Sequence, residues 1–190
     1  MAGGGLPRLA PVWALGGALL GLASGALAAP LRDAATGLAV EPPPAYAATA
    51  MPRHGDQAAR FAIRRADEQD HGCQVAYVPA PQNAGLAQER INALLLSPGW
   101  QAITRRQIGT SYEVLESGVS EQGGIVSFRL VADLRPRADL PERALALRSF
   151  FSIQETPRGR TTTVCAAPKA EFPARRAEFQ AVMKGISPPR

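Results

Sequence analysis

The sequence predicts an α+β protein in which an antiparallel β-sheet carries two helices packed on one face. Several segments alternate apolar and polar residues with the period of a strand, and only two segments have helical spacing. The expected order is strands, one helix, four strands and a second helix. Because strands and helices do not alternate regularly along the chain, a parallel α/β sheet is not expected.

The first strands precede the first helix. Residues 37–41 alternate and end at three prolines, whereas residues 45–57 are irregular, with Pro52 and Gly55 as breakers. Residues 60–65 and 73–78 alternate on either side of a polar turn. This pattern predicts an antiparallel hairpin.

The first predicted helix covers residues 85–96. Its apolar residues recur at helical spacing, and Asn83 is placed to cap its beginning. Ser97-Pro98-Gly99 is expected to end the helix, with Trp100 packing against that end.

Two hairpins follow the first helix. Residues 112–119 and 125–134 meet at Gly123-Gly124, and residues 125–134 alternate most clearly in the whole chain. Residues 144–155 and 160–166 meet at a type I turn with Pro157 at its second position.

The last predicted element is an amphipathic helix over residues 172–186, which ends before Pro188-Pro189. Its apolar face is expected to pack on the sheet. That face contains Phe172, Phe179, Val182, Met183 and Ile186.

Residues 1–28 have the pattern of a cleavable signal peptide. Arg8 precedes an uncharged apolar run, and Ala26-Leu27-Ala28 is a small-x-small cleavage pattern. The alternative is a membrane anchor that is retained, because the run is long enough to span a bilayer. Cleavage after Ala28 predicts a periplasmic or secreted protein.

After the signal peptide, the sequence predicts a flexible segment over residues 29–36, a single domain over residues 37–187 and a tail over residues 188–190. No second apolar run reaches the length of a membrane span. We therefore expect a soluble protein with no transmembrane segment once the leader is removed.

The chain has two cysteines, Cys73 and Cys165. An even number of cysteines in an exported chain predicts a disulfide, and both lie in predicted strands. Two buried free thiols or one catalytic thiol are the alternatives. The catalytic alternative lacks an obvious base, although His71 is close in sequence.

The net charge of +5 comes mostly from arginine, because the chain has lysine only at positions 169 and 184. No basic stripe with interleaved aromatic residues is found, so nucleic acid is not an expected partner. Arg158 and Arg160 on a tight turn, with Arg175 and Arg176 in the last helix, form a candidate site for anionic lipid or polymer.

The two histidines, His54 and His71, lie in predicted loops. Their spacing to the cysteines matches no zinc-ligand pattern, so no metal or cofactor site is expected. Glu113 and Glu116 are three apart on a predicted strand, which places them on opposite faces and makes them a poor acid/base pair.

The order of the elements resembles the PsbP-like family. The resemblance lies in the opening Gly37–Pro42, the strand-to-helix passage 73–96, the hairpin ending at Thr163-Val164-Cys165, and the closing helix 171–186. It implies a PsbP-like fold. It also implies an accessory or binding role, since members of this family are mostly non-catalytic.

These observations together predict an exported, non-enzymatic accessory or binding protein of the cell envelope. Its partner would be an unknown envelope protein or an anionic surface. Two alternatives remain open. One is an envelope hydrolase that uses a loop histidine with a carboxylate, and the other is a protein that binds anionic lipid or polymer through its surface arginines.

Overall fold

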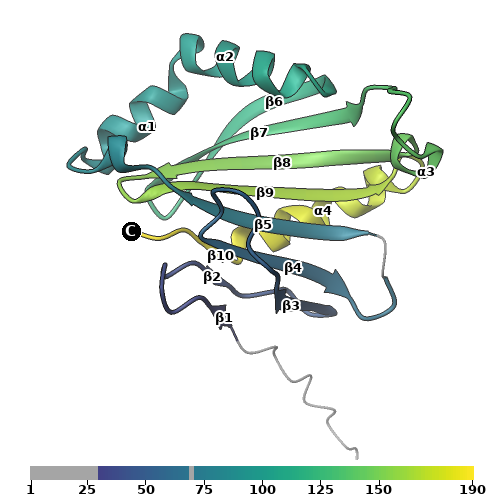
Figure 1. The fold of residues 1–190 in the computed structure, drawn as a ribbon, viewed down its shortest axis with the longest axis horizontal. Helices are drawn as coiled ribbons and strands as arrows, with labels where there is room; N and C mark the ends of the chain where they lie inside the picture. Colours follow the sequence, from purple (N-terminus) through teal and green to yellow (C-terminus); the bar gives the residue numbers. More distant parts are fainter. Residues whose placement is uncertain (1–29, 69–70) are drawn as a thin grey trace, which may run out of the picture.

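The computed structural model describes residues 30–68 and 71–190, so the predicted signal peptide lies outside the described residues. The centre of the fold is an antiparallel seven-stranded sheet in the order β3-β4-β5-β9-β8-β7-β6 (Figure 1). Its strands are β3 (Tyr46–Ala50), β4 (Ala59–Arg65), β5 (Gly72–Pro79), β6 (Tyr112–Gln122), β7 (Ile125–Leu134), β8 (Leu147–Thr156) and β9 (Gly159–Pro168).

A second, small sheet joins the two ends of the described chain. Strands β1 (Leu31–Arg32) and β10 (Ile186–Ser187) both pair with β2 (Ala39–Val40). The side chain of Asp33 closes the β1–β2 turn by accepting bonds from the backbone N–H and the hydroxyl of Thr36, at 2.8 and 2.7 Å. Residues 31–36 are therefore part of the folded domain, and the expectation of a flexible segment there is corrected.

The last three residues pack against the domain in the same way. Pro188 and Pro189 are buried, and the hydroxyl of Thr156 donates to the carbonyl of Pro189 at 2.7 Å. The Arg190 guanidinium donates to the carbonyl of Gly123 at 2.7 Å. The segment expected as a tail therefore contacts the tips of two hairpins.

The helices lie on both faces of the large sheet. On one face, α1 (Gln88–Leu96) and α2 (Pro98–Gly109) cover β6, β7 and β8 (Figure 1). On the other face, α4 (Phe172–Lys184) packs on β8 and β9. The single-turn α3 (Glu142–Leu145) and the 3-10 helix η1 (Pro81–Asn83) lie in connections. None of the described helices has the length and hydrophobicity needed to cross a membrane.

The α+β class and the antiparallel sheet are confirmed, but the placement of the helices differs from the expectation of two helices on one face. The reason is that the central strands are apolar on both faces. Phe150 and Phe151 are consecutive and both buried. Phe150 joins the core under α4, and Phe151 joins the core on the opposite face.

Helix α2 is an element that the sequence did not predict. Ser97 ends α1, as expected, but its hydroxyl also caps α2 by accepting the backbone N–H of Trp100 at 3.3 Å. Pro98 then occupies the first helical position, where its missing N–H costs nothing. Asn83 is not a cap, because its side chain donates to the carbonyl of Thr156 at 3.1 Å.

The two helix layers enclose separate cores. The core under α4 combines Phe172, Phe179, Val182 and Met183 with apolar residues of β4, β5 and β9. All five apolar residues predicted for the last helical segment, Ile186 included, are buried. The opposite core places Trp100 and Ile108 of α2 over Phe128, Leu130 and Phe151.

Candidate functional site: a groove on the open half of the sheet

The predicted disulfide is confirmed. Cys73 of β5 and Cys165 of β9 lie directly opposite each other and are bonded. Both residues are buried on the face of the sheet that α4 covers. Because both sulfur atoms are held in this bond, the free-thiol and catalytic-thiol alternatives are excluded in this state.

Gly72 allows β4 to approach β5 closely at the residue before Cys73. Its φ of +125° lies in a region that side chains rarely adopt, and a Cβ there would come within 2.7 Å of the carbonyl oxygen of Ile63. The tight approach places the β4–β5 connection beside Cys73.

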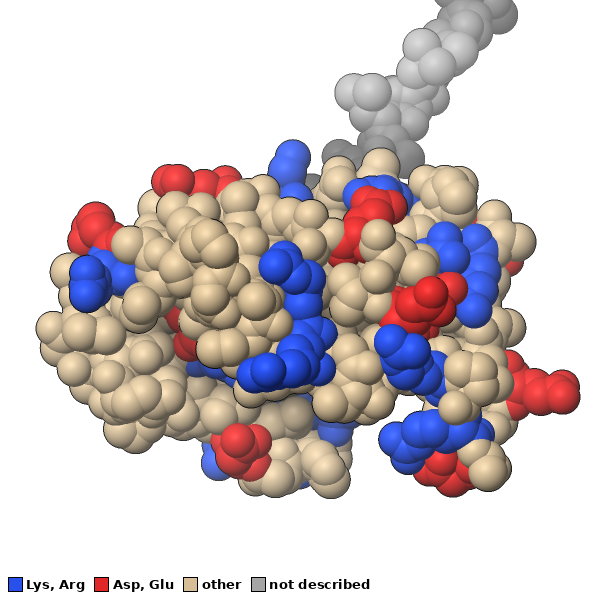
Figure 2. All heavy atoms as spheres, turned by 90° about the horizontal axis from the view of Figure 1, so that it is seen from above, with Lys and Arg blue, Asp and Glu red and all other residues tan. Residues whose placement is uncertain are grey.

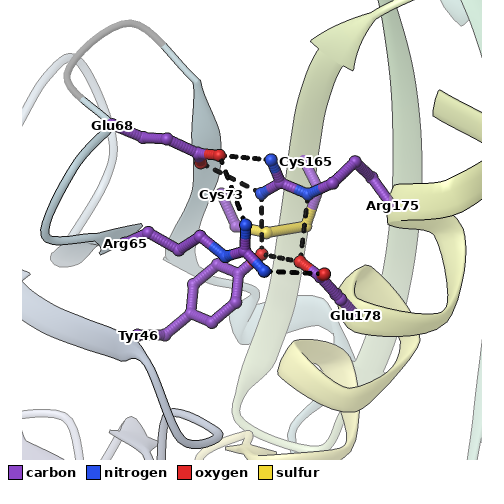
Figure 3. A network of polar contacts seen from close by, with 7 residues as sticks. All are labelled: Tyr46, Arg65, Glu68, Cys73, Cys165, Arg175 and Glu178. Atoms are coloured by element: carbon purple, nitrogen blue, oxygen red, sulfur yellow. Dashed lines mark hydrogen bonds and ion pairs between the residues drawn. A yellow bond between two sulfur atoms is a disulfide. The ribbon is translucent and has the colours of Figure 1, made fainter. Parts of the chain in front are cut away.

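Arg175 is the centre of a buried polar network next to the disulfide (Figure 3). Its guanidinium binds both carboxylate oxygens of Glu68, donates to Glu178 at 3.0 Å and donates to the hydroxyl of Tyr46 at 2.8 Å. The Tyr46 hydroxyl donates to Glu178 at 2.7 Å, and Arg65 donates to the same carboxylate at 2.8 Å. Two arginines thus meet two glutamates, and the formal charges cancel.

This environment shifts two pKa values. The hydrogen bonds to Glu68 raise the pKa of Arg175 further above its ordinary value. Burial, reinforced by the bond to Glu178, raises the pKa of Tyr46. Arg175 is only 6% exposed and is already bonded to Glu68, Glu178 and Tyr46, so it is not available to an external anion. The network instead ties the β4–β5 connection to α4.

The other three arginines of the predicted anion site do not join one cluster. Arg176 binds Glu116 through two bonds of 2.6 and 3.0 Å, and Arg160 binds Glu155 at 2.6 Å. Arg158 is exposed and makes no ion pair with any residue that the structure describes. Arg158 and Arg160 lie at the tip of the β8–β9 hairpin, whereas α4 begins after the other end of β9.

A groove of about 610 Å³ lies on the half of the sheet that α1 and α2 leave open. Its floor consists of small or short side chains of β5 and β9, half-buried because no helix covers them: Ala76, Val78, Thr162, Val164 and Ala166. Longer side chains stand on both sides of this floor, which makes the open face concave.

One wall of the groove is basic and the other is largely apolar. Arg60, Arg64 and Gln74 form the basic wall, where Arg60 donates to Gln74 at 2.6 Å. Tyr112, Ala144, Leu134 and Leu147 lie on the opposite side, with Ser149 between the two walls. Among the described residues that line the groove there is no aspartate or glutamate.

Gln57 and His71 mark the two ends of the groove. The register of β4 and β5 places Gln57 near Tyr77 and His71 next to Gly72. The side-chain atoms Gln57 Oε1 and His71 Nδ1 are buried and have no hydrogen-bond partner among the described residues. Each end therefore presents a polar atom that a ligand or water can satisfy.

Basic and acidic side chains both occur on the face that Figure 2 draws. Figure 2 shows one face on which blue side chains adjoin near the centre, and both red and blue side chains lie among the tan ones around them. On the face that the figure draws, no field of a single sign extends over the surface. Among the described residues that line the groove, the charged side chains are arginines.

The two histidines have different positions. His54 is exposed in the connection before β4, whereas His71 lines the groove. No group of three or more histidine, cysteine, aspartate or glutamate side chains among the described residues could hold a metal ion. Among the described residues that line the groove, none is a carboxylate that could orient His71 as a general base.

Glu113 and Glu116 were expected on opposite faces of a strand, but a β-bulge places them on the same face. Glu113 pairs with Asp133 and Glu116 pairs with Val131, because the register shifts at Leu115. Asp133 and Val131 are two residues apart and share a face, so the two glutamates share one too. Val131 belongs to the core under α4, which is the face opposite the groove.

The comparisons with known proteins indicate the fold but no family by sequence. A scan against known protein families finds none that matches, and a search of curated protein sequences finds no match. Among solved structures, the fold is similar to the solution structure of cyanobacterial PsbP (CyanoP) from Synechocystis sp. PCC 6803. The TM-score is 0.54 at 11% identity, over 87% of this chain and 95% of that one.

Two further structures match more distantly. A protein of unknown function from Pseudomonas aeruginosa, PA94, gives a TM-score of 0.43 at 13% identity, over 85% of this chain and 97% of that one. A protein from Bacteroides thetaiotaomicron gives 0.42 at 9% identity, over 86% of this chain and 49% of that one. The likeness to CyanoP confirms the resemblance seen in the sequence: this chain has a PsbP-like fold.

Proposed function

We propose that this chain is an extracytoplasmic, non-enzymatic binding protein that holds its ligand in the groove between β4 and β8. The observation that carries the proposal is the groove itself. Its volume of about 610 Å³ lies within the range of roughly 300–1,000 Å³ typical of small-molecule sites. Its apolar floor and few convergent polar groups are also typical of such sites.

The opposite face of the same strands supports a binding role. β5 and β9 form the centre of the groove floor, and the disulfide and the Arg175 network fix these strands from behind. A ligand that binds a fixed floor loses less free energy to ordering the protein. The groove therefore provides a preformed surface.

The lining favours binding over hydrolysis. A hydrolase of the predicted kind needs a carboxylate to orient His71 and a nucleophile or water beside it. Glu68 and Glu178 bond to Arg175 on the face of the sheet that α4 covers. Among the described residues of its lining, the groove offers His71 as a polar group with no carboxylate partner.

The extracytoplasmic location rests on the disulfide together with the leader pattern of residues 1–28. Intact-mass measurement of the protein from the cell that produces it tests this directly. We expect a chain that begins at Ala29 and is 2 Da lighter than its reduced form, the mass of two thiol hydrogens. A chain in the cytosol that begins at Met1 and has two alkylatable thiols would contradict the location.

The binding role is tested by blocking the groove. Ala76→Trp places a large side chain on the groove floor, and Val119→Trp adds the same side chain to β6, where Val119 is 46% exposed and does not line the groove. Native mass spectrometry of protein exposed to an envelope extract should show a bound species on the wild type and on Val119→Trp, but not on Ala76→Trp. Equal retention by Ala76→Trp would contradict the proposed function.

A further inference from the structure

We propose that the ligand of the groove is an anionic amphiphile, with an acidic head group at the end formed by Arg64 and His71 and an alkyl chain along the floor of β5 and β9. This inference rests on the proposed function and names its ligand class. The head group is a carboxylate or a phosphate, since both are recognised by the same planar guanidinium groups.

The charge of the groove points to an anion. Arg60 and Arg64 lie on the same side of β4, and neither makes an ion pair with a residue that the structure describes. By contrast, Arg160, Arg175 and Arg176 all contact glutamates. The groove therefore holds two arginines whose charge the described part of the protein leaves uncompensated.

The end of the groove near Arg64 has the groups that an acidic head needs. Gly72 lies against the Arg64 side chain, and both Arg64 and His71 line the groove. The buried Nδ1 atom of His71 has no partner among the described residues, and Ser149 lines the same end. An oxyanion at this position can accept bonds from the guanidinium, the imidazole N–H and the hydroxyl.

The apolar floor of the groove indicates that the ligand has an apolar part. Ala76, Val78, Val164 and Ala166 form a strip that a small inorganic anion would leave uncovered. Gly72 and Val78 of β5 both line the groove, and six residue steps of about 3.3 Å place its ends roughly 20 Å apart. A single extended alkyl chain fits this narrow strip and buries apolar surface on both sides.

Calorimetric titration with four single-chain amphiphiles, each below its critical micelle concentration, tests the inference. Dodecanoate and dodecyl phosphate should bind the wild type at least about tenfold more tightly than dodecyltrimethylammonium and dodecyl maltoside, by the complementarity of charge. The ratio between the two anions tells which head group the site prefers.

Two double variants separate the groove from general charge. Arg60→Gln with Arg64→Gln should weaken dodecanoate binding at least about tenfold. Arg106→Gln with Arg158→Gln removes the same charge outside the groove and should leave the affinity unchanged. Equal losses in both double variants would overturn the inference, because binding would then follow net charge.

Different results would contradict the anionic ligand class and the binding role of the groove. If the cationic amphiphile binds as tightly as dodecanoate, or if no amphiphile binds, the anionic ligand class is wrong. The proposed function would still stand if an extract yields another species, such as an acidic peptide, that Ala76→Trp excludes. If Ala76→Trp excludes nothing from the extract and no amphiphile binds, both proposals fail.

Discussion

The two faces of the β5–β9 strand pair have different roles: one is buried in the core and the other forms a groove. On the face under α4, the alternate residues Cys73, Val75 and Cys165 are buried in the main core beside a charge-balanced network around Arg175. On the other face, Ala76 and Val164 form the floor of an open groove, and its arginines have no carboxylate partner among the described residues of the lining. Because side chains alternate along a strand, the protein can fix a binding surface from behind.

From this comparison we expect that residues on the α4 face contribute most to the free energy of unfolding. Removal of the disulfide should lower that free energy most. The bond joins residues 92 apart in the sequence, and the loop-entropy model gives about 4–5 kcal/mol for a loop of that size. Cys73→Ala with Cys165→Ala should lower the free energy of unfolding by that amount, measured by urea denaturation.

The wild type under a reducing agent is the control for the disulfide prediction, and it should lose a similar free energy without any change of side chain. Loss of less than about 1 kcal/mol in both samples would show that the fold does not depend on this cross-link.

Arg175→Met should have the next largest effect. The change leaves Glu68 and Glu178 with fewer partners in a partly buried site, and breaking a buried ion pair from one side costs up to about 3–5 kcal/mol. Arg176→Met is a matched control at the next residue of α4. Its ion pair with Glu116 is exposed, so it should cost at most about 1 kcal/mol. If Arg175→Met and Arg176→Met lose equal stability in thermal or urea unfolding, the Arg175 network is not the stronger of the two.

Asp133 should make stability depend on pH. Hydrogen bonds from Arg148 hold the pKa of Asp133 below its ordinary value. A carboxylate with a lowered pKa in the folded state contributes stability above its unfolded pKa, and this contribution is lost as pH falls through the folded value. Asp133→Asn should therefore cost roughly 1–2 kcal/mol at neutral pH and progressively less in acid.

Asp139→Asn is the control for the pH prediction, because Asp139 and its partner Arg137 are both well exposed. Urea unfolding measured between pH 7 and pH 3 should show a steeper acid loss for the wild type than for Asp133→Asn, with Asp139→Asn close to the wild type. If the free energies of unfolding of the wild type and Asp133→Asn fall in parallel as pH is lowered, the Asp133 carboxylate does not contribute pH-dependent stability.

The smallest effect on stability is expected in the groove. Arg60→Gln with Arg64→Gln removes no ion pair among the described residues and only one hydrogen bond, between Arg60 and Gln74. The free energy of unfolding should therefore stay within about 0.5 kcal/mol of the wild type. A loss comparable to that of Arg175→Met would mean that the groove arginines are structural, and the contrast between the two faces would disappear.

Local patterns in the sequence predicted much of the fold. The alternation at residues 125–134 and the apolar spacing around Phe179 correspond to β7 and α4. Helix α2 was missed because Ser97-Pro98-Gly99 contains signals both for ending one helix and for beginning another. The face that each helix covers depends on the order of strands in the sheet, which local patterns do not contain.

The candidate site was predicted less well, because the partners of charged residues are distant in sequence. The sequence places Arg175 and Arg176 in a predicted anion site, yet their partners Glu68 and Glu116 are 107 and 60 residues away. Arg60 and Arg64 carried a usable signal: four residues apart on a strand, they point to the same side. The sequence pattern alone does not show that this side of β4 lines an open groove.

The most direct test of the account is the position of a bound anionic amphiphile, measured by amide chemical shifts as dodecanoate is added. We predict that the largest changes fall on Arg60, Gln74 and Thr162, which line the groove, while Phe179 and Val182 of α4 stay near their free positions. Changes centred on α4, or on α1 and α2, would contradict the assignment of binding to the open face of β5 and β9.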